Sequence, residues 1–106
     1  SQRSLVLAQR IRHYLSSAKI LGTLGNAYRH LADHDKAIEC QKQSLTLAQE
    51  LRDQRSEMAA LNNLGLAYKA ANDPQAAIQC ERNALEIAQE LQDYVATGQI
   101  LKNLGN

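Results

Sequence analysis

The side chains best suited to catalysis or metal binding are His13, His30, His34, Cys40 and Cys80. His30 and His34 have the i, i+4 spacing that places two imidazoles on one helix face, where they can share a metal ion. A turn is expected between them, however, and no third ligand is evident nearby. No serine or cysteine nucleophile is placed to use a histidine as its base. We therefore expect no enzyme, no metal site and no cofactor.

The two cysteines are expected to remain free thiols. Cys40 and Cys80 are separated by 40 positions. If they occupy equivalent points on packed helices, at least the ~8–10 Å between neighbouring helix axes lies between them. A disulfide requires Cα atoms within about 7 Å of each other. Buried thiols act as small apolar groups and are typical of a reducing compartment, which favours a cytoplasmic location.

The same 40-residue interval recurs along the whole chain. Residues 21–60 and 61–100 are identical at 15 of 40 aligned positions. The register extends to Ser4–Gln9 before them and to Leu101–Asn106 after them. A period between 20 and 50 residues indicates a stack of supersecondary units.

Each unit is predicted to contain two amphipathic helices. Leu21, Leu24 and Tyr28 recur at i, i+3 and i+7, which is one face of a first helix. A second apolar face with helical spacing runs from Ala37 to Leu51. The pattern predicts helices near residues 1–12, 15–32, 35–52, 54–71, 74–92 and 94–106. Aspartates between them can accept hydrogen bonds from free N–H groups at a helix start, and the predicted caps are Asp53, Asp73 and Asp93.

A glycine lies inside the first helix of each unit, at Gly25 and Gly65. Glycine costs about 1 kcal/mol relative to alanine at such a position, so a packing reason is expected. Ala37 and Ala77 stand at the matching place in the second helix. We expect these small residues to face the glycines and let the antiparallel helices approach closely. A helix break at glycine is the alternative, but the leucine spacing continues across it.

These features resemble the tetratricopeptide repeat family. Its pattern of a large residue, Leu-Gly and Tyr on the first helix, followed by alanine on the second, is matched by Leu21, Leu24-Gly25, Tyr28 and Ala37, and again by Leu61, Leu64-Gly65, Tyr68, Ala77 and Ala84. Gln41 and Glu81 replace the usual aromatic residue of the second helix. The proline that usually ends this helix is absent, which lengthens the repeat from about 34 to 40 residues. Such long repeats resemble those of Pins-related spindle-orientation adaptors and of bacterial multi-repeat proteins.

The resemblance implies an all-α fold, a right-handed α-solenoid of antiparallel helix pairs. Residues 1–14 would be the second helix of a preceding repeat, 15–53 and 54–93 two full repeats, and 94–106 the truncated first helix of a third. The chain is therefore expected to be a single 1–106 fragment of a longer array.

Acidic residues avoid the first helix of each repeat. Only Glu57 lies within the bodies of these helices, although the chain has 11 acidic and 12 basic residues and a net charge of +1. In the family, first helices line a concave groove, so the resemblance implies a basic groove for an acidic peptide or protein partner. Asparagine suits a peptide backbone, and lysine and arginine suit carboxylates. The expected groove residues are Lys19, Asn26, Arg29, Asn62, Leu66, Lys69, Gln99, Lys102 and Asn106.

Other interpretations remain open at this point. The basic residues of the first helices could simply be solvated helix faces, although the depletion of acidic residues across three such helices favours a groove. Apolar faces on the terminal helices favour end-to-end self-association into a homo-oligomer, and a regulatory sensor module of a larger multidomain protein is a third function. A net charge near zero and the lack of an apolar run of ~20 residues argue against nucleic acid and membrane partners. Leu66 stands where a chaperone-tail receptor would need a second asparagine, which disfavours that partner class.

Overall fold

The computed structural model describes residues 2–105, and they fold into helices joined by short turns. The helices are α1 (Gln2–His30), α2 (His34–Leu51), α3 (Gln54–Ala70), α4 (Pro74–Glu90) and α5 (Tyr94–Gly105). No strand occurs within these residues. The predicted all-α class is confirmed.

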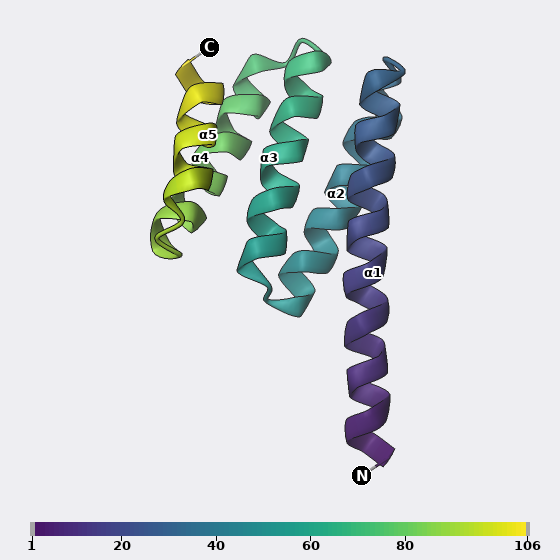
Figure 1. Cartoon of the computed structure of the whole chain (residues 1–106). Helices are drawn as coiled ribbons and strands as arrows, with labels where there is room; N and C mark the ends of the chain where they lie inside the picture. Colours follow the sequence, from purple (N-terminus) through teal and green to yellow (C-terminus); the bar gives the residue numbers. More distant parts are fainter. Residues whose placement is uncertain (1, 106) are drawn as a thin grey trace.

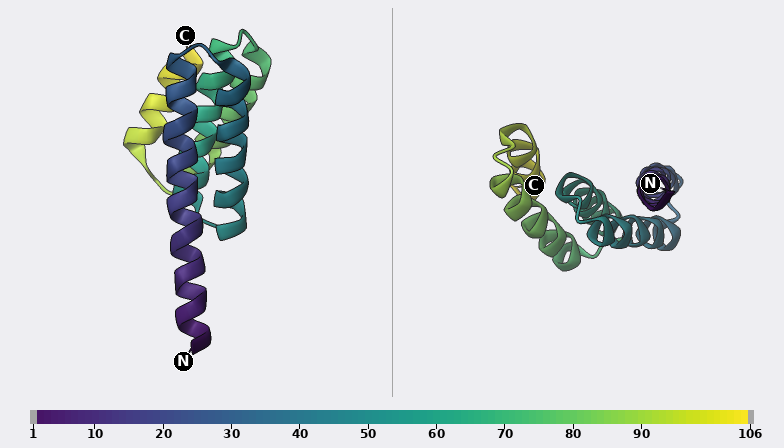
Figure 2. Two further views of the ribbon diagram at one scale, coloured as in Figure 1. Left: turned by 90° about the vertical axis from the view of Figure 1, so that its right-hand side faces the viewer. Right: turned by 90° about the horizontal axis from the view of Figure 1, so that it is seen from below.

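Successive helices run antiparallel and form two layers (Figure 1). Each helix packs against the next in the chain, and α1 also contacts α3. The A helices α1, α3 and α5 lie on the concave side of the resulting arc, and the B helices α2 and α4 form its other side (Figure 2). The molecule measures 51 × 32 × 18 Å. This neighbour-to-neighbour packing is that of a helical repeat solenoid.

All four turns between the helices have the same geometry. The residue before each capping aspartate has a positive φ, between 54° and 65°, at Ala32, Arg52, Asn72 and Gln92. Each aspartate donates its backbone N–H to the carbonyl five residues earlier, over 2.9–3.1 Å, and its carboxylate accepts from the amide three residues later. These bonds end one helix and start the next. The predicted caps Asp53, Asp73 and Asp93 are confirmed, and Asp33 acts in the same way.

The first helix does not match its predicted boundaries. Separate helices were expected near 1–12 and 15–32, but α1 is continuous from Gln2 to His30. The capping aspartates follow one another every 20 residues, and the position 20 residues before Asp33 is occupied by His13. The segment around it contains no aspartate, glycine or proline, so it lacks the capping residue that the four turns share, and the helix continues through it. The first half of α1 consequently projects beyond the other helices (Figure 1).

The core consists mainly of small side chains at the helix seams. Ala37, Ala48, Ala84 and Ala88 are fully buried. A larger apolar cluster lies where α3, α4 and α5 meet, and it contains Leu61, Leu64, Cys80, Ile87 and Ile100. Cys40 and Cys80 are buried free thiols, as predicted. Burial of both thiols, together with the nearby Glu39 and Glu81 carboxylates, raises their pKa, so neither is activated as a nucleophile.

Candidate functional site

Two hollows lie between successive A helices and occupy equivalent places in the repeat. The α1–α3 hollow has a volume of about 310 Å³ and is lined by Ala18, Lys19, Gly22, Thr23, Asn26, Ser44, Ser56, Ala59, Ala60 and Asn63. The α3–α5 hollow has about 160 Å³ and is lined by Met58, Ala59, Asn62, Ala96, Gln99 and Ile100. Every residue of the second hollow lies 40 positions after a residue of the first. The groove is therefore a repeating surface rather than one isolated pocket.

The hollows contain four of the predicted groove residues. Lys19 and Asn26 line the α1–α3 hollow, and Asn62 and Gln99 line the α3–α5 hollow. The remaining predicted residues line neither hollow: Arg29 and Leu66 are half-buried, Lys69 and Lys102 are exposed, and Asn106 lies outside the described residues.

Residues of the α1–α3 hollow that were absent from the predicted set include Ser44 and Asn63. Ser44 Oγ donates to the Ala18 carbonyl over 2.8 Å, which ties α2 to α1 behind the hollow. Its sequence signal was the difference between the repeats, because the equivalent residue of the second repeat is Ala84. Asn63 could have been identified from the sequence because an asparagine recurs at the equivalent position of the next repeat, Asn103.

Long polar side chains, and not alanines, are the close neighbours of the helix glycines. A Cβ built on Gly25 would lie 2.5 Å from Gln41 Nε2, and one built on Gly65 would lie 2.6 Å from Glu81 Oε1. The atoms nearest to the glycines thus belong to Gln41 and Glu81, and the expected partners Ala37 and Ala77 are not among them. Gln41 and Glu81 stand at the position of the family's aromatic residue, and their side chains extend across the helix seam to the A helix.

Gln41 connects α2 to the backbone of α1. Its Nε2 donates to the Gly22 carbonyl over 2.9 Å and to Asn26 Oδ1 over 3.4 Å. The side chain is 1% exposed, and its Oε1 has no hydrogen-bond partner. An unpaired buried acceptor of this kind is unfavourable, and it requires an explanation.

Glu81 is a buried carboxyl group in the equivalent place of the second repeat. Burial raises its pKa to about 7, although the charge of Lys69 and a hydrogen bond from Asn103 act in the opposite direction. The Asn62 amide lies between Glu81 and Asn103. With its nitrogen toward Glu81 it donates to Oε2 and Oε1 over 3.0 and 3.2 Å, and with its oxygen there it accepts from Asn103 Nδ2 over 3.1 Å. The two orientations exclude each other, so the amide bonds either Glu81 of α4 or Asn103 of α5, and Asn103 is itself hydrogen-bonded to Glu81.

The two helix layers differ in charge. Helix α1 carries five basic residues and no acidic one, and Glu57 is the one acidic residue of α3 and α5. Arg55 is paired with Asp93 over 3.5 Å. Lys19, Lys69 and Lys102 are exposed and make no ion pair within residues 2–105. The side of the A helices therefore presents unpaired positive charge.

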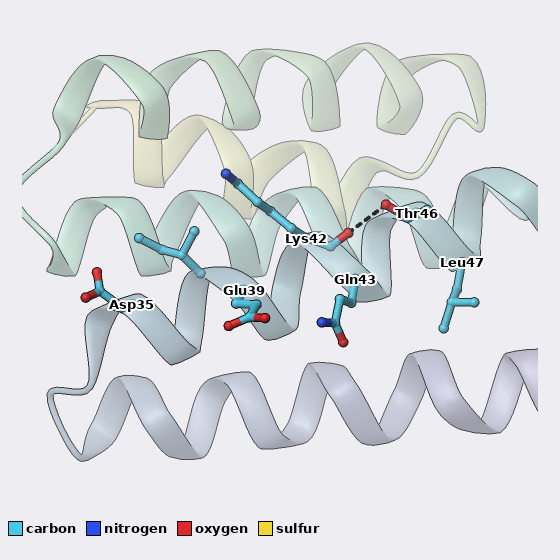
Figure 3. A pocket seen from close by; sticks show the side chains of 7 residues that line it. Asp35, Glu39, Lys42, Gln43, Thr46 and Leu47 are labelled. Carbon is cyan, nitrogen blue, oxygen red and sulfur yellow. Dashed lines mark hydrogen bonds between the residues drawn. The ribbon is translucent and has the colours of Figure 1, made fainter.

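A larger hollow of about 580 Å³ lies on the B-helix side, but it is less suited to binding (Figure 3). All its lining residues come from α2: Asp35, Ile38, Glu39, Lys42, Gln43, Thr46 and Leu47. The hydrogen bond shown in Figure 3 lies within α2, where Thr46 Oγ1 donates to the Lys42 carbonyl over 3.0 Å. No polar groups from different helices converge there, as they do in specific ligand sites.

The histidines and acids do not gather into a metal site in the described part of the chain, where no group of three metal-binding side chains occurs. A helix of the length and apolar character that spans a bilayer is likewise absent from residues 2–105.

Comparison with known proteins agrees with this geometry. A family model of the tetratricopeptide repeat matches residues 16–90, which is more than half of the chain. A search of curated proteins finds no match. Paired antiparallel helices, the Leu-Gly and Tyr positions of the A helices and the match over both repeats lead to one conclusion: the chain belongs to the tetratricopeptide repeat family.

Proposed function

We propose that the chain is a non-catalytic scaffold that holds an extended, net-acidic segment of a partner protein along its A helices. Tetratricopeptide repeats are in general protein–protein interaction modules. The observation that carries the proposal is the pair of repeat-equivalent hollows between α1, α3 and α5. An extended peptide places side chains at regular intervals, so a groove with regularly spaced hollows suits it.

Charge supports an acidic partner. Lys19 stands at the edge of the α1–α3 hollow, and Lys102 lies on α5 at the position 80 residues after Gly22, which lines the first hollow. Both lysines are exposed and unpaired within the described residues. Each is available to a carboxylate of the partner, which adds recognition by charge to the shape of the hollows.

The double variant Lys19→Glu, Lys102→Glu is expected to weaken binding of acidic peptides by about tenfold or more. One exposed ion pair contributes only ~0–1 kcal/mol, but two reversals replace two attractions by repulsions. Fluorescence anisotropy with a library of labelled acidic peptides measures the loss, which should shrink as salt rises above ~0.15 M. Lys69 is left unchanged because its charge acts on the pKa of buried Glu81.

The matched control reverses two exposed charges on the B helices, Lys42→Glu and Arg82→Glu. Binding should change little in this control. Equal losses in the two double variants would show that the attraction is a diffuse effect of net charge and would reject a groove on the A helices.

A second function, self-association, is favoured by the outer face of α1. Ile20 is 64% exposed, whereas its repeat equivalents Ala60 and Ile100 are each 2% exposed. Leu24 is 41% exposed, and its equivalent Leu64 is 4% exposed. In α3 and α5 these positions are covered by neighbouring helices, so this face of α1 has the character of an unoccupied repeat interface. A second copy, or the repeat to which residues 1–14 would belong in a longer array, fits this face.

Sedimentation at high micromolar concentration is therefore expected to show dimers or longer species of the 106-residue chain. Ile20→Lys should return it to a monomer, because a charge would be buried in the contact. The control Ile78→Lys alters an exposed isoleucine on α4 and should leave association unchanged. A monomeric parent at these concentrations would contradict this function.

A further inference from the structure

The two repeats differ at the residue that faces the hollow between successive A helices. In the second repeat this residue is Asn62, whose amide lies against Glu81 and Asn103. In the first repeat the equivalent residue is Gly22. It has no side chain to make the corresponding contacts with Gln41 and Asn63. The α1–α3 hollow is accordingly about twice as large as the α3–α5 hollow.

Polar atoms surround the space that Gly22 leaves. A Cβ built on this glycine would lie 3.9 Å from each of Gln41 Oε1, Asn63 Nδ2 and Ser44 Oγ. Ser44 Oγ already donates to the Ala18 carbonyl, and the Asn63 side chain makes no hydrogen bond to another described residue. Gln41 Nε2 donates to the Gly22 carbonyl and to Asn26 Oδ1. These two hydrogen bonds fix the orientation of the amide and leave its other atom, Oε1, without a partner. Gln41 Oε1 therefore lies beneath this space as a buried acceptor without a donor, and the unpaired Asn63 amide lines the hollow beside it.

We propose that the α1–α3 hollow is a subsite for a carboxamide side chain, asparagine or glutamine, of the partner segment. Its NH₂ group donates to Gln41 Oε1, and its oxygen accepts from Asn63 Nδ2. The incoming group thus takes the place that the Asn62 amide holds in the second repeat. Gln41 Oε1 is buried below the hollow, so the incoming group must displace side chains at the floor of the hollow to reach it. The proposal rests on the proposed peptide groove and names one residue of its ligand.

Other side chains suit the subsite less well. A carboxylate has no proton to donate and would place an oxygen against Gln41 Oε1. An ammonium group can donate, but Lys19 at the edge of the hollow repels it. An apolar side chain would leave the Gln41 acceptor unpaired after the hollow closes over it. A hydroxyl both donates and accepts, but through a single oxygen, whereas a carboxamide donates from its nitrogen and accepts at its oxygen and so can meet Gln41 Oε1 and Asn63 Nδ2 with separate atoms.

The first test uses a small probe, so it does not depend on peptide binding. Propionamide titrated into the ¹⁵N-labelled chain should give saturable shifts of the backbone signals of Gly22, Ser44 and Asn63. N,N-dimethylpropionamide lacks N–H donors and should not. Equal shifts from both amides would overturn the proposal, and so would no shift from either.

The second test uses acidic peptides that differ at one position. Peptides with glutamine there should bind about five- to tenfold more tightly than the same peptides with glutamate or norleucine. Gly22→Asn installs the residue of the second repeat and should remove this preference while the chain stays folded. Gly98→Asn is the matched control, because nothing lies within 4 Å of a Cβ built on Gly98, and it should keep the preference. Tight binding with no preference for glutamine would reject the subsite alone. Propionamide shifts without binding of any acidic peptide would reject the peptide groove and leave the subsite standing.

Discussion

Replacing either helix glycine by leucine, as Gly25→Leu or Gly65→Leu, is expected to lower the free energy of unfolding by about 3 kcal/mol or more. Adding side-chain atoms to a filled seam typically costs 1–3 kcal/mol, and here the first added carbon already overlaps a neighbour. A Cβ on Gly25 would approach Gln41 Nε2, Cδ and Cγ to 2.5, 2.9 and 3.0 Å. Gln41 cannot withdraw cheaply, because it is buried and bonded to the Gly22 carbonyl. Urea unfolding followed by circular dichroism measures the loss.

Gly98→Leu is the matched control. Gly98 is an exposed helix glycine with open space around it, so leucine should be neutral or slightly stabilising through its better helix propensity. A double-mutant cycle identifies the neighbour: Gly25→Ala should cost less when Gln41→Ser has shortened the opposing side chain. If the leucine variants unfold like the parent, or if the cycle shows no coupling, the seam is not closed by Gln41 and Glu81.

The fold was largely predictable because its signals are local and repeated. The 40-residue identities defined the unit, and the aspartates at 53, 73 and 93 marked helix starts through the same short-range hydrogen bonds that the structure contains. The lack of a capping aspartate near residue 13 accounts for the wrong boundary that was predicted in α1. The 40-residue register suggested a boundary near residue 13, but the capping aspartate of the other turns is replaced there by His13, and α1 runs on from Gln2 to His30.

The groove was predictable only in part. The spacing of Lys19, Asn26, Asn62 and Gln99 placed them on one face of the A helices, and the structure brings each pair into a hollow. Ser44 could not be assigned from the A-helix register, because it reaches the α1–α3 hollow from α2 behind it. The role of Gln41 and Glu81 was missed for a related reason. A polar residue in an aromatic position looks like a surface substitution until the distance across the seam is known.

Glu81→Gln is expected to stabilise the chain by on the order of 3 kcal/mol at pH 8 and to change little at pH 4.5. Burial raises the pKa of Glu81 from 4.5 to about 7, so between these values the folded state binds a proton that the unfolded state releases. Folding therefore becomes less favourable as pH rises from 4.5 through 7, and each pKa unit corresponds to about 1.4 kcal/mol. Glutamine keeps the length of the side chain and its contact with Asn62 but carries no charge to bury.

The measurement is the difference in unfolding free energy between variant and parent over pH 4.5–8, which removes the contribution of every group that titrates equally in both. The groups that face Glu81 are Lys69 and Asn62 from α3 and Asn103 from α5, and glutamine retains hydrogen bonds with the two amides.

The converse change Gln41→Glu supplies the matched test in the first repeat. It should introduce a loss of stability with rising pH, because the new carboxylate would face the Gly22 carbonyl that Gln41 Nε2 now binds. Exposed Glu39→Gln should leave the pH profile unchanged. If Glu81→Gln and the parent show parallel profiles over pH 4.5–8, the pKa of Glu81 is the same in the folded and unfolded chain, and burial does not destabilise its ionised form.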